Sequence, residues 1–272
     1  MFQTIITPSE LVNYKGKCTI IDCRFYLSDK NQGYQEYLEG HIPNAVYAHL
    51  DDDLSGEIIK GKTGRHPLPS VDKAIHLFSQ FGIDEHTQVV AYCSFGGGIA
   101  ARVWWMLKWL GHENVAVLDG GWQNWIANDF PVSKEIVKPK STNFKPKVNP
   151  NVVVDFVILE EATANPQHII VDSRTAPRYR GEHEPIDPVA GHIPSAVNYP
   201  WVENLNEQKQ FLAKETLQER FKELLSTDKV LTFYCGSGVT ACHNILTLEY
   251  LGYKGAKLYP GSWSEWIVKK EL

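Results

Sequence analysis

The 272-residue sequence lacks the features that mark several classes of protein. It has no excess of positive charge, since 27 Lys and Arg stand against 32 Asp and Glu, so a nucleic-acid or anionic-membrane partner is not expected. No apolar run approaches the length of a membrane span. The first residues show no basic region followed by an apolar stretch, so we expect no secretory signal.

Cysteine is also scarce. The five cysteines include no C-x-x-C pair, which is typical of neither a disulfide framework nor a zinc site. The sequence therefore predicts no metal centre and indicates a reducing cytoplasm as the location of the protein.

The sequence is dominated by an internal repeat. Short motifs of the first half recur in the same order in the second: 20–24 (IIDCR) as 170–174 (IVDSR), 40–46 (GHIPNAV) as 191–197 (GHIPSAV), 89–93 (VVAYC) as a run ending in Tyr234-Cys235, and 120–125 as 260–266. This order indicates a tandem duplication.

Each half alternates short apolar runs with helix-like stretches such as 71–80 and 100–110, a pattern that predicts an α/β fold with parallel strands and helices on both faces. Residues 131–150 are rich in Pro and Lys, which predicts an extended linker. We therefore expect domains at 1–133 and 152–272, joined by a linker at 134–151.

Cys235 ends a β-branched and aromatic run and is followed by a glycine-containing loop and a helix-compatible segment from Thr240 to Leu248. A strand, tight loop and helix in this order place the thiol at the carboxyl end of a strand, where open α/β sheets bind ligands. Loop N–H groups and the helix amino terminus stabilise an anion there, so the thiol is a candidate nucleophile. The alternative is a small buried cysteine with no chemistry, as most cysteines of α/β proteins are.

Three stretches carry a resemblance to a known family: 256–266 (AKLYPGSWSEW), 37–45 (YLEGHIPNA) and 64–69 (GRHPLP). With them the whole chain resembles the two-domain rhodanese family, the thiosulfate and 3-mercaptopyruvate sulfurtransferases. The resemblance implies two tandem rhodanese-like domains, each a five-stranded parallel sheet flanked by helices, with only the second catalytic.

The resemblance also implies a mechanism. Cys235 takes sulfur from a small anionic donor, thiosulfate or 3-mercaptopyruvate, and passes it as a persulfide to cyanide or a thiol, such as that of a thioredoxin-like protein, without a metal or cofactor. A persulfide cradle is expected from the residues that follow Cys235, namely Gly236, Ser237, Gly238, Val239 and Thr240, with the Ser237 hydroxyl as a further donor.

Arg178 is the expected donor-binding residue. It aligns with Ser28 of the first half, so the fold does not require it, and members of the family carry a donor-binding arginine at this position. The alternative is a solvated surface arginine. Ile186 stands where mercaptopyruvate-specific relatives carry a second arginine, which argues against strict mercaptopyruvate specificity, whereas the loop 236–238 resembles the mercaptopyruvate type.

Residues shared by both halves are expected to be structural, in particular Arg24 and Arg174, which we expect to pair with the neighbouring aspartates. Cys93 matches Cys235, but 18 positions separate it from Gly111 against 17 from Cys235 to Gly252. We expect this extra residue and Phe95 to spoil a ring of amides and leave Cys93 inactive.

Two rival functions remain at this stage. A phosphatase of this fold needs an arginine six residues after the cysteine, and Ala241 stands there. A persulfide carrier or docking module without turnover of a small donor is the second rival.

Overall fold

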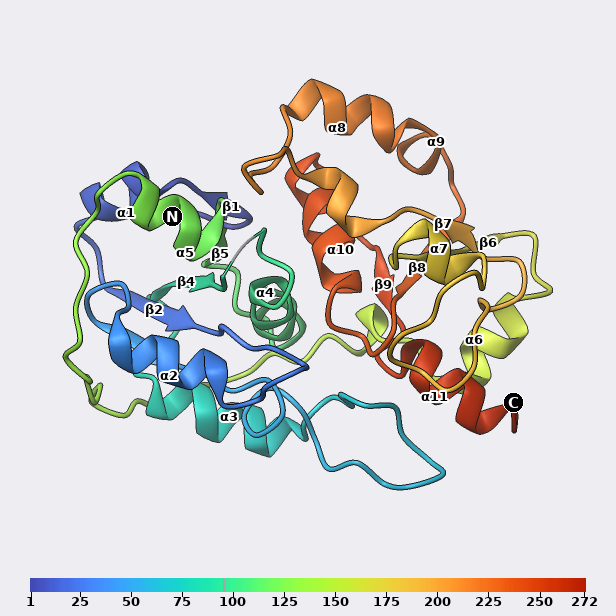
Figure 1. The fold of residues 1–272 in the computed structure, drawn as a ribbon, viewed down its shortest axis with the longest axis horizontal. Helices are drawn as coiled ribbons and strands as arrows, with labels where there is room; N and C mark the ends of the chain where they lie inside the picture. Colours follow the sequence, from blue (N-terminus) through green and yellow to red (C-terminus); the bar gives the residue numbers. More distant parts are fainter. Residues whose placement is uncertain (95) are drawn as a thin grey trace. The chain divides into compact units, whose positions relative to one another are not determined.

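The computed structural model describes residues 1–94 and 96–272 (Figure 1). It divides into two compact units. Unit 1 comprises Met1–Gly56, Pro69–Asn149 and Glu207–Phe211, and unit 2 comprises Glu57–Leu68, Pro150–Asn206 and Leu212–Leu272. Each unit therefore contains one repeat and a short segment from the other half of the chain.

Unit 1 holds a parallel sheet with the strand order β1-β5-β4-β2-β3. Its strands are β1 (Ile5–Ile6), β2 (Cys18–Asp22), β3 (Ala45–Tyr47), β4 (Gln88–Tyr92) and β5 (Val115–Leu118). Its helices are α1 (Pro8–Asn13), α2 (Gln32–Glu39), α3 (Val71–Gln80), α4 (Ala100–Trp109) and α5 (Gly121–Ala127). The helices predicted at 71–80 and 100–110 are confirmed.

The core of unit 1 forms because alternate residues of its strands face opposite sides of the sheet. Val90 and Tyr92 of β4 pack with Leu11 of α1, Tyr37 of α2 and Trp125 of α5 on one face. Helix α4, which is buried along nearly its whole length, contacts β4 and β5. Burial of both faces explains why the central strands read as continuous apolar runs rather than alternating ones.

Much of the segment expected to be a linker packs on unit 1. The Thr142 N–H donates to the carbonyl oxygen of Ser79 over 2.9 Å, and Phe144 is buried with its ring edge-on to Phe78. Residues up to Asn149 consequently belong to unit 1.

Unit 2 repeats the plan with the strand order β7-β6-β8-β9. Its strands are β6 (His168–Asp172), β7 (Val197–Asn198), β8 (Val230–Tyr234) and β9 (Lys257–Leu258). Its helices are α6 (Phe156–Ala162), α7 (Ala176–Tyr179), α8 (Lys214–Arg220), α9 (Lys222–Leu225), α10 (Ala241–Tyr250) and α11 (Ser262–Lys269), with 3-10 turns at η1 (Pro150–Val152) and η2 (Trp201–Asn204).

Two parallel sheets flanked by helices confirm the predicted α/β class, with one difference in strand number. Among the described residues the second sheet has four strands where five were expected, and a single parallel bridge between Val153 and Leu258 takes the fifth position. The core of unit 2 places Leu159 of α6, Tyr179 of α7 and Trp263 of α11 on one face, and α10 contacts β8 and β9.

The paired arginines have the structural role expected of them. Arg24 donates to both carboxylate oxygens of Asp22 and to the carbonyl oxygen of Gly40, and Arg174 makes the same bonds to Asp172 and Gly191. Each guanidinium is almost completely buried beside its aspartate, so the two charges compensate each other. The prediction that these arginines pair with the neighbouring aspartates is confirmed.

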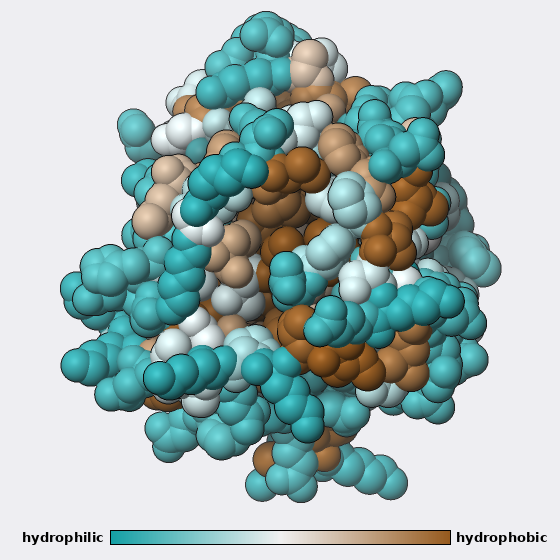
Figure 2. All heavy atoms as spheres, turned by 90° about the vertical axis from the view of Figure 1, so that its left-hand side faces the viewer, coloured by the Kyte–Doolittle hydropathy of each residue, from teal (hydrophilic) through white to brown (hydrophobic). Residues whose placement is uncertain are grey.

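Hydrophilic side chains predominate on the face shown in Figure 2, with smaller hydrophobic patches between them. Large hydrophobic residues that are exposed in unit 1 include Ile126, Val132 and Ile136. Within the part of the chain that the structure describes, none of the helices has the length and apolar character that crossing a membrane requires.

Candidate active site

Cys235 directly follows β8 and begins a loop that leads into α10 at Ala241, which confirms the predicted strand, loop and helix. The loop is held from the side of α11. The Cys235 N–H donates to Oγ of Ser262 over 3.1 Å, and the Cys235 carbonyl oxygen accepts from the Trp263 N–H over 3.0 Å. The Gly236 carbonyl oxygen accepts from the Ser264 N–H over 2.9 Å. These bonds fix the backbone on both sides of the sulfur.

Gly238 gives the loop its tight curvature. Its φ of 75° lies in the left-handed region that favours glycine, and a Cβ at this position would lie 2.3 Å from the carbonyl oxygen of Pro260. A larger residue would therefore push the loop away from the segment that precedes α11.

The loop stabilises negative charge on the sulfur of Cys235, which is 2% exposed. Burial raises the pKa of the thiol, while the Thr240 hydroxyl and the backbone N–H groups of Ser237, Ala241 and Val239 lower it by hydrogen bonding. The hydrogen bonds outweigh the effect of burial, so the pKa of Cys235 lies below that of an ordinary cysteine. The Cys235 thiolate therefore forms more readily than that of an ordinary cysteine.

The hydroxyl groups of Ser237 and Thr240 have different hydrogen-bond partners. The Ser237 side chain, expected to donate to the sulfur, forms a 2.7 Å hydrogen bond with Nδ1 of His66, and both residues are buried. The hydroxyl that bonds to Cys235 is that of Thr240.

Arg178 lies above the loop in a cluster of buried charges. Its Nε donates to both oxygens of Glu184 at 3.1 and 3.0 Å, and its Nη2 donates to Glu184 at 2.7 Å and to Asp187 at 3.2 Å. The Arg178 side chain is only 15% exposed, so Arg178 is not the solvated surface arginine that the alternative interpretation requires. Burial raises the pKa of Asp187, although the positive charge of Arg65 opposes this effect. At Glu184 burial also raises the pKa, but hydrogen bonds from Arg178 and from two backbone N–H groups outweigh it, so the pKa of Glu184 is lowered.

Arg65 and His66 are functional candidates that the motif analysis of the Cys235 loop missed. Arg65 forms an ion pair with Asp187 and reaches the space above Gly236. The sequence held a signal, because two basic residues stand in the 64–69 stretch that carries part of the family resemblance.

Cys93 occupies the matching position in unit 1, directly after β4. Its carbonyl oxygen accepts from the Trp122 N–H over 2.9 Å, as that of Cys235 does from Trp263. Phe95, on which the expected disruption of the amide ring partly depends, lies outside the described residues. The role of Cys93 therefore stays a prediction.

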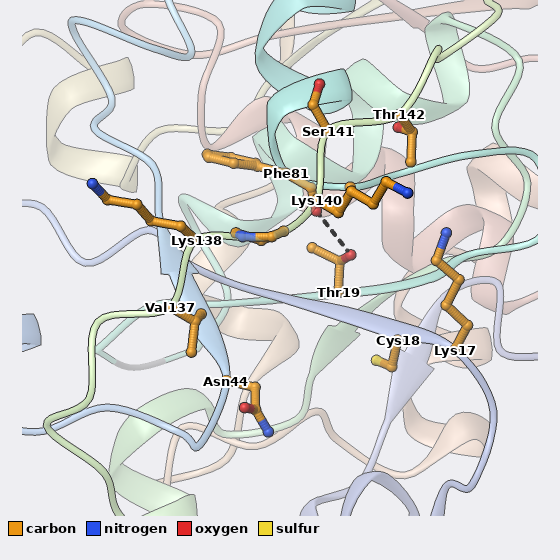
Figure 3. Close-up of a pocket in the computed structure, with 12 residues that line it drawn as sticks. Lys17, Cys18, Thr19, Asn44, Phe81, Val137, Lys138, Lys140, Ser141 and Thr142 are labelled. Carbon is orange, nitrogen blue, oxygen red and sulfur yellow. Dashed lines mark hydrogen bonds between the residues drawn. The ribbon is translucent and has the colours of Figure 1, made fainter.

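A separate pocket of about 600 Å³ in unit 1 is lined by the beginning of β2, the end of α3 and residues 137–142 (Figure 3). The Thr19 hydroxyl in this pocket donates to the carbonyl oxygen of Phe81 over 3.2 Å. Burial raises the pKa of the neighbouring Cys18 thiol to about 12, so this sulfur is protonated at neutral pH. Among the described residues no cluster of three or more His, Cys, Asp and Glu side chains could hold a metal ion.

Comparison with known proteins gives consistent results for both halves. The rhodanese-like domain matches residues 7–128 and 157–269. A protein of Pseudomonas aeruginosa named "Probable 3-mercaptopyruvate sulfurtransferase" is 42% identical over 92% of this chain and 89% of its own length. Thiosulfate sulfurtransferase of Gallus gallus is 33% identical over 91% of this chain and 86% of its own length. The crystal structure of SseA from Escherichia coli, a 3-mercaptopyruvate sulfotransferase, is 29% identical, with a TM-score of 0.83 over 97% of this chain and all of its own.

Proposed function

The chain belongs to the rhodanese family and is a sulfurtransferase, and we propose that Cys235 carries the transferred sulfur as a persulfide. The observation behind this proposal is the position of a buried thiol directly after β8, surrounded by the N–H groups of Ser237, Val239 and Ala241 and the hydroxyl of Thr240, which lower its pKa. The cradle comprises Gly236, Ser237, Gly238, Val239 and Thr240. We further propose that the catalytic domain is 152–272 and that 1–133 is not catalytic.

In the first half-reaction the Cys235 thiolate attacks the outer sulfur of the donor. With thiosulfate, the S–S bond of the donor breaks and sulfite leaves with the bonding electron pair. With 3-mercaptopyruvate, the C–S bond breaks and the thiol proton passes to the carbon, which gives pyruvate. Either way Cys235 gains one sulfur atom, and the negative charge moves to the terminal sulfur of the persulfide, which the cradle can stabilise.

In the second half-reaction a nucleophile attacks the terminal sulfur and regenerates the Cys235 thiolate. Cyanide would leave as thiocyanate, and a thiol would leave as a new persulfide. We propose small thiols or a thioredoxin-like protein as acceptors and a reducing cytoplasm as the location, since the five cysteines, all among the described residues, form no disulfide bond. Two separate displacements predict ping-pong kinetics.

The guanidinium groups near Cys235 favour an enzyme that turns over a small anionic donor over a persulfide carrier that does not. Nη2 of Arg178 lies 3.4 Å from the position that a Cβ of Gly236 would occupy, one residue from the nucleophile. A phosphatase is disfavoured because Ala241, six positions after Cys235, has a buried methyl group and offers only its backbone N–H to the site.

The test is to treat the purified chain with thiosulfate or 3-mercaptopyruvate, with added cyanide to measure thiocyanate or pyruvate release, and without an acceptor to measure the intact mass. We expect catalytic turnover with at least one donor and the addition of one sulfur atom at Cys235. Addition of sulfur without turnover would indicate a carrier, and no addition with either donor would overturn the proposal.

A further inference from the structure

Two cysteines follow neighbouring strands of the sheet in unit 1. Cys23 comes directly after β2, and Cys93 comes directly after β4. These two strands are parallel and pair in register as far as Asp22 and Tyr92 (Figure 1). The pairing continues one step further, because the Cys23 N–H donates to the Tyr92 carbonyl oxygen over 2.8 Å. Neighbouring strands lie about 4.8 Å apart, which is a Cα separation that a disulfide bond can span.

The two thiols belong to the same face of this sheet. Side chains alternate between the faces along a strand, so Cys23 and Cys93 share one face. The preceding pair shares the other face, where the Tyr92 hydroxyl donates to Oδ2 of Asp22 over 2.7 Å. Sγ of Cys23 donates to the Tyr92 carbonyl oxygen over 3.0 Å. This sulfur therefore lies against the peptide group that joins Tyr92 to Cys93.

Both thiols are buried, with exposed fractions of 0% for Cys23 and 4% for Cys93. Burial raises the pKa of Cys23, and the Cys93 thiol raises it further because two negatively charged sulfur atoms would repel each other. Cys23 is therefore protonated at neutral pH. A site of this kind admits a small oxidant more readily than a bulky one such as a peptide disulfide.

Unit 2 carries only one thiol at the equivalent pair of positions. The residue after β8 is Cys235, but the residue after β6 is Ser173, whose Oγ accepts from Nδ2 of Asn244 over 2.9 Å. The Ser173 N–H makes the same bond to the neighbouring strand, over 2.8 Å, that the Cys23 N–H makes in unit 1. The backbone thus accommodates either residue, and the fold does not require a second thiol.

We infer that Cys23 and Cys93 form a redox-active dithiol, which a peroxide converts to a disulfide bond between the ends of β2 and β4. The site is separate from Cys235, and the inference does not depend on the proposed sulfur transfer. Cys93 is the thiol that reacts with the oxidant, because Cys23 is completely buried and protonated and a neutral thiol is a poor nucleophile.

The oxidation has two steps. The sulfur of Cys93 attacks one oxygen of hydrogen peroxide, the O–O bond breaks, and Cys93 becomes a sulfenic acid while water leaves. The sulfur of Cys23 then attacks the Cys93 sulfur, and its proton passes to the leaving hydroxyl group, which departs as a second water. The two thiols together lose two electrons, which reduce one peroxide to two waters. Formation of the disulfide prevents the irreversible oxidation of Cys93 to sulfinic acid.

The test exposes the folded chain to hydrogen peroxide, removes the excess with catalase and blocks the remaining thiols with iodoacetamide in denaturant. Peptide mapping by mass spectrometry without reduction should show the Cys23 peptide joined to the Cys93 peptide, with the loss of two hydrogen atoms. Dithiothreitol should restore both thiols. Oxidation of Cys93 to sulfinic acid without the link would overturn the inference, and so would two unoxidised thiols at a peroxide concentration that oxidises Cys235.

Cys18→Ser and Cys23→Ser are matched variants. Cys18 also lies on β2, but five positions before Cys23 and therefore on the opposite face, so Cys18→Ser should keep the link. Trypsin leaves both cysteines in the peptide 18–24, and this variant identifies the one that is joined. Cys23→Ser should lose the link and accumulate sulfinic acid at Cys93. Loss of the link in Cys18→Ser, or its persistence in Cys23→Ser, would overturn the inference.

The two thiols should also titrate as one redox couple. In dithiothreitol buffers of graded potential, the reduced fractions of Cys23 and Cys93 should follow a single curve for a two-electron exchange. Two separate curves would contradict the inference. A link that forms only in protein unfolded by urea would do the same, because the folded sheet would then not bring the two sulfur atoms together.

Discussion

The backbone N–H of Trp263 donates to the carbonyl oxygen of Cys235 over 3.0 Å, and this bond ties the first turn of α11 to the residue that carries the nucleophile. In unit 1, Trp122 makes the same bond to Cys93 over 2.9 Å. The two cysteines therefore have equivalent backbone settings at the ends of equivalent strands. We therefore expect any difference in reactivity to come from the loops that follow them and from the side chains around those loops.

Cys235→Ser should abolish sulfur transfer, and Cys93→Ser should leave most of it. The reason is that the Cys235 loop provides N–H groups and the Thr240 hydroxyl to a thiol of lowered pKa, whereas the loop after Cys93 is one residue longer. Intact-protein mass spectrometry after donor treatment should show one added sulfur, absent only in Cys235→Ser. Sulfur mapped to Cys93 alone would contradict the assignment.

Thr240→Val should raise the pKa of Cys235, because the thiolate loses a hydroxyl donor while burial continues to favour the neutral thiol. The rate of alkylation by iodoacetamide against pH should then rise at higher pH than in the wild type. At pH values below the pKa of Cys235, the thiolate population of Thr240→Val should be about tenfold or more lower than that of the wild type. Thr240→Ser keeps the hydroxyl and is the control, and a valine variant with the wild-type profile would remove Thr240 from the site.

The sequence predicted the local parts of this site well, because they are contiguous. The β8 strand, the Cys235 loop and the start of α10 lie within 230–250, and strand, glycine and helix signals mark them. The repeat also predicted correctly that Arg24 and Arg174 pair with the aspartates two positions earlier. Both are short-range relationships that composition and spacing express directly.

The remaining part of the site depends on contacts between distant segments. His66 meets Ser237 across 171 positions, and Arg65 meets Asp187 across 122. No local periodicity encodes that Glu57–Leu68 belongs to unit 2, since this follows from how the whole chain packs. The strand, loop and helix around Cys235 could thus be predicted, whereas the contacts of Arg65 and His66 could not.

Gly238→Ala should damage the loop more than Gly252→Ala. Both glycines have positive φ, so each substitution costs about 1–2 kcal/mol in backbone strain. Only at Gly238 would the new Cβ meet another atom, the Pro260 carbonyl oxygen, since nothing lies within 4 Å at Gly252. We expect a further loss of about 1–3 kcal/mol in urea unfolding and slower persulfide formation in Gly238→Ala. Equal effects of the two substitutions would contradict this prediction, because they would show that the Cys235 loop can shift to accommodate the added Cβ.

Arg178→Ala should weaken the first half-reaction and leave persulfide discharge nearly unchanged. Nη1 and Nη2 of Arg178 lie 3.6 and 3.4 Å from the position that a Cβ of Gly236 would occupy, where we propose that the donor anion binds. One hydrogen bond to a charged group is worth about 1.5–3 kcal/mol, which corresponds to roughly a tenfold to hundredfold loss in kcat/KM for the donor. Stopped-flow measurement of the two half-reactions checks both parts.

The matched variants for Arg178 are Arg178→Lys and Arg180→Ala. Lysine should rescue only partly, since it cannot donate to Glu184 and to the anion through one planar group. Arg180 is about half exposed and pairs with Glu182, so its removal tests whether loss of one nearby positive charge is sufficient to slow the donor step. Similar donor rates in Arg178→Ala and Arg180→Ala, with both proteins folded, would leave Arg178 with a structural role toward Glu184 alone.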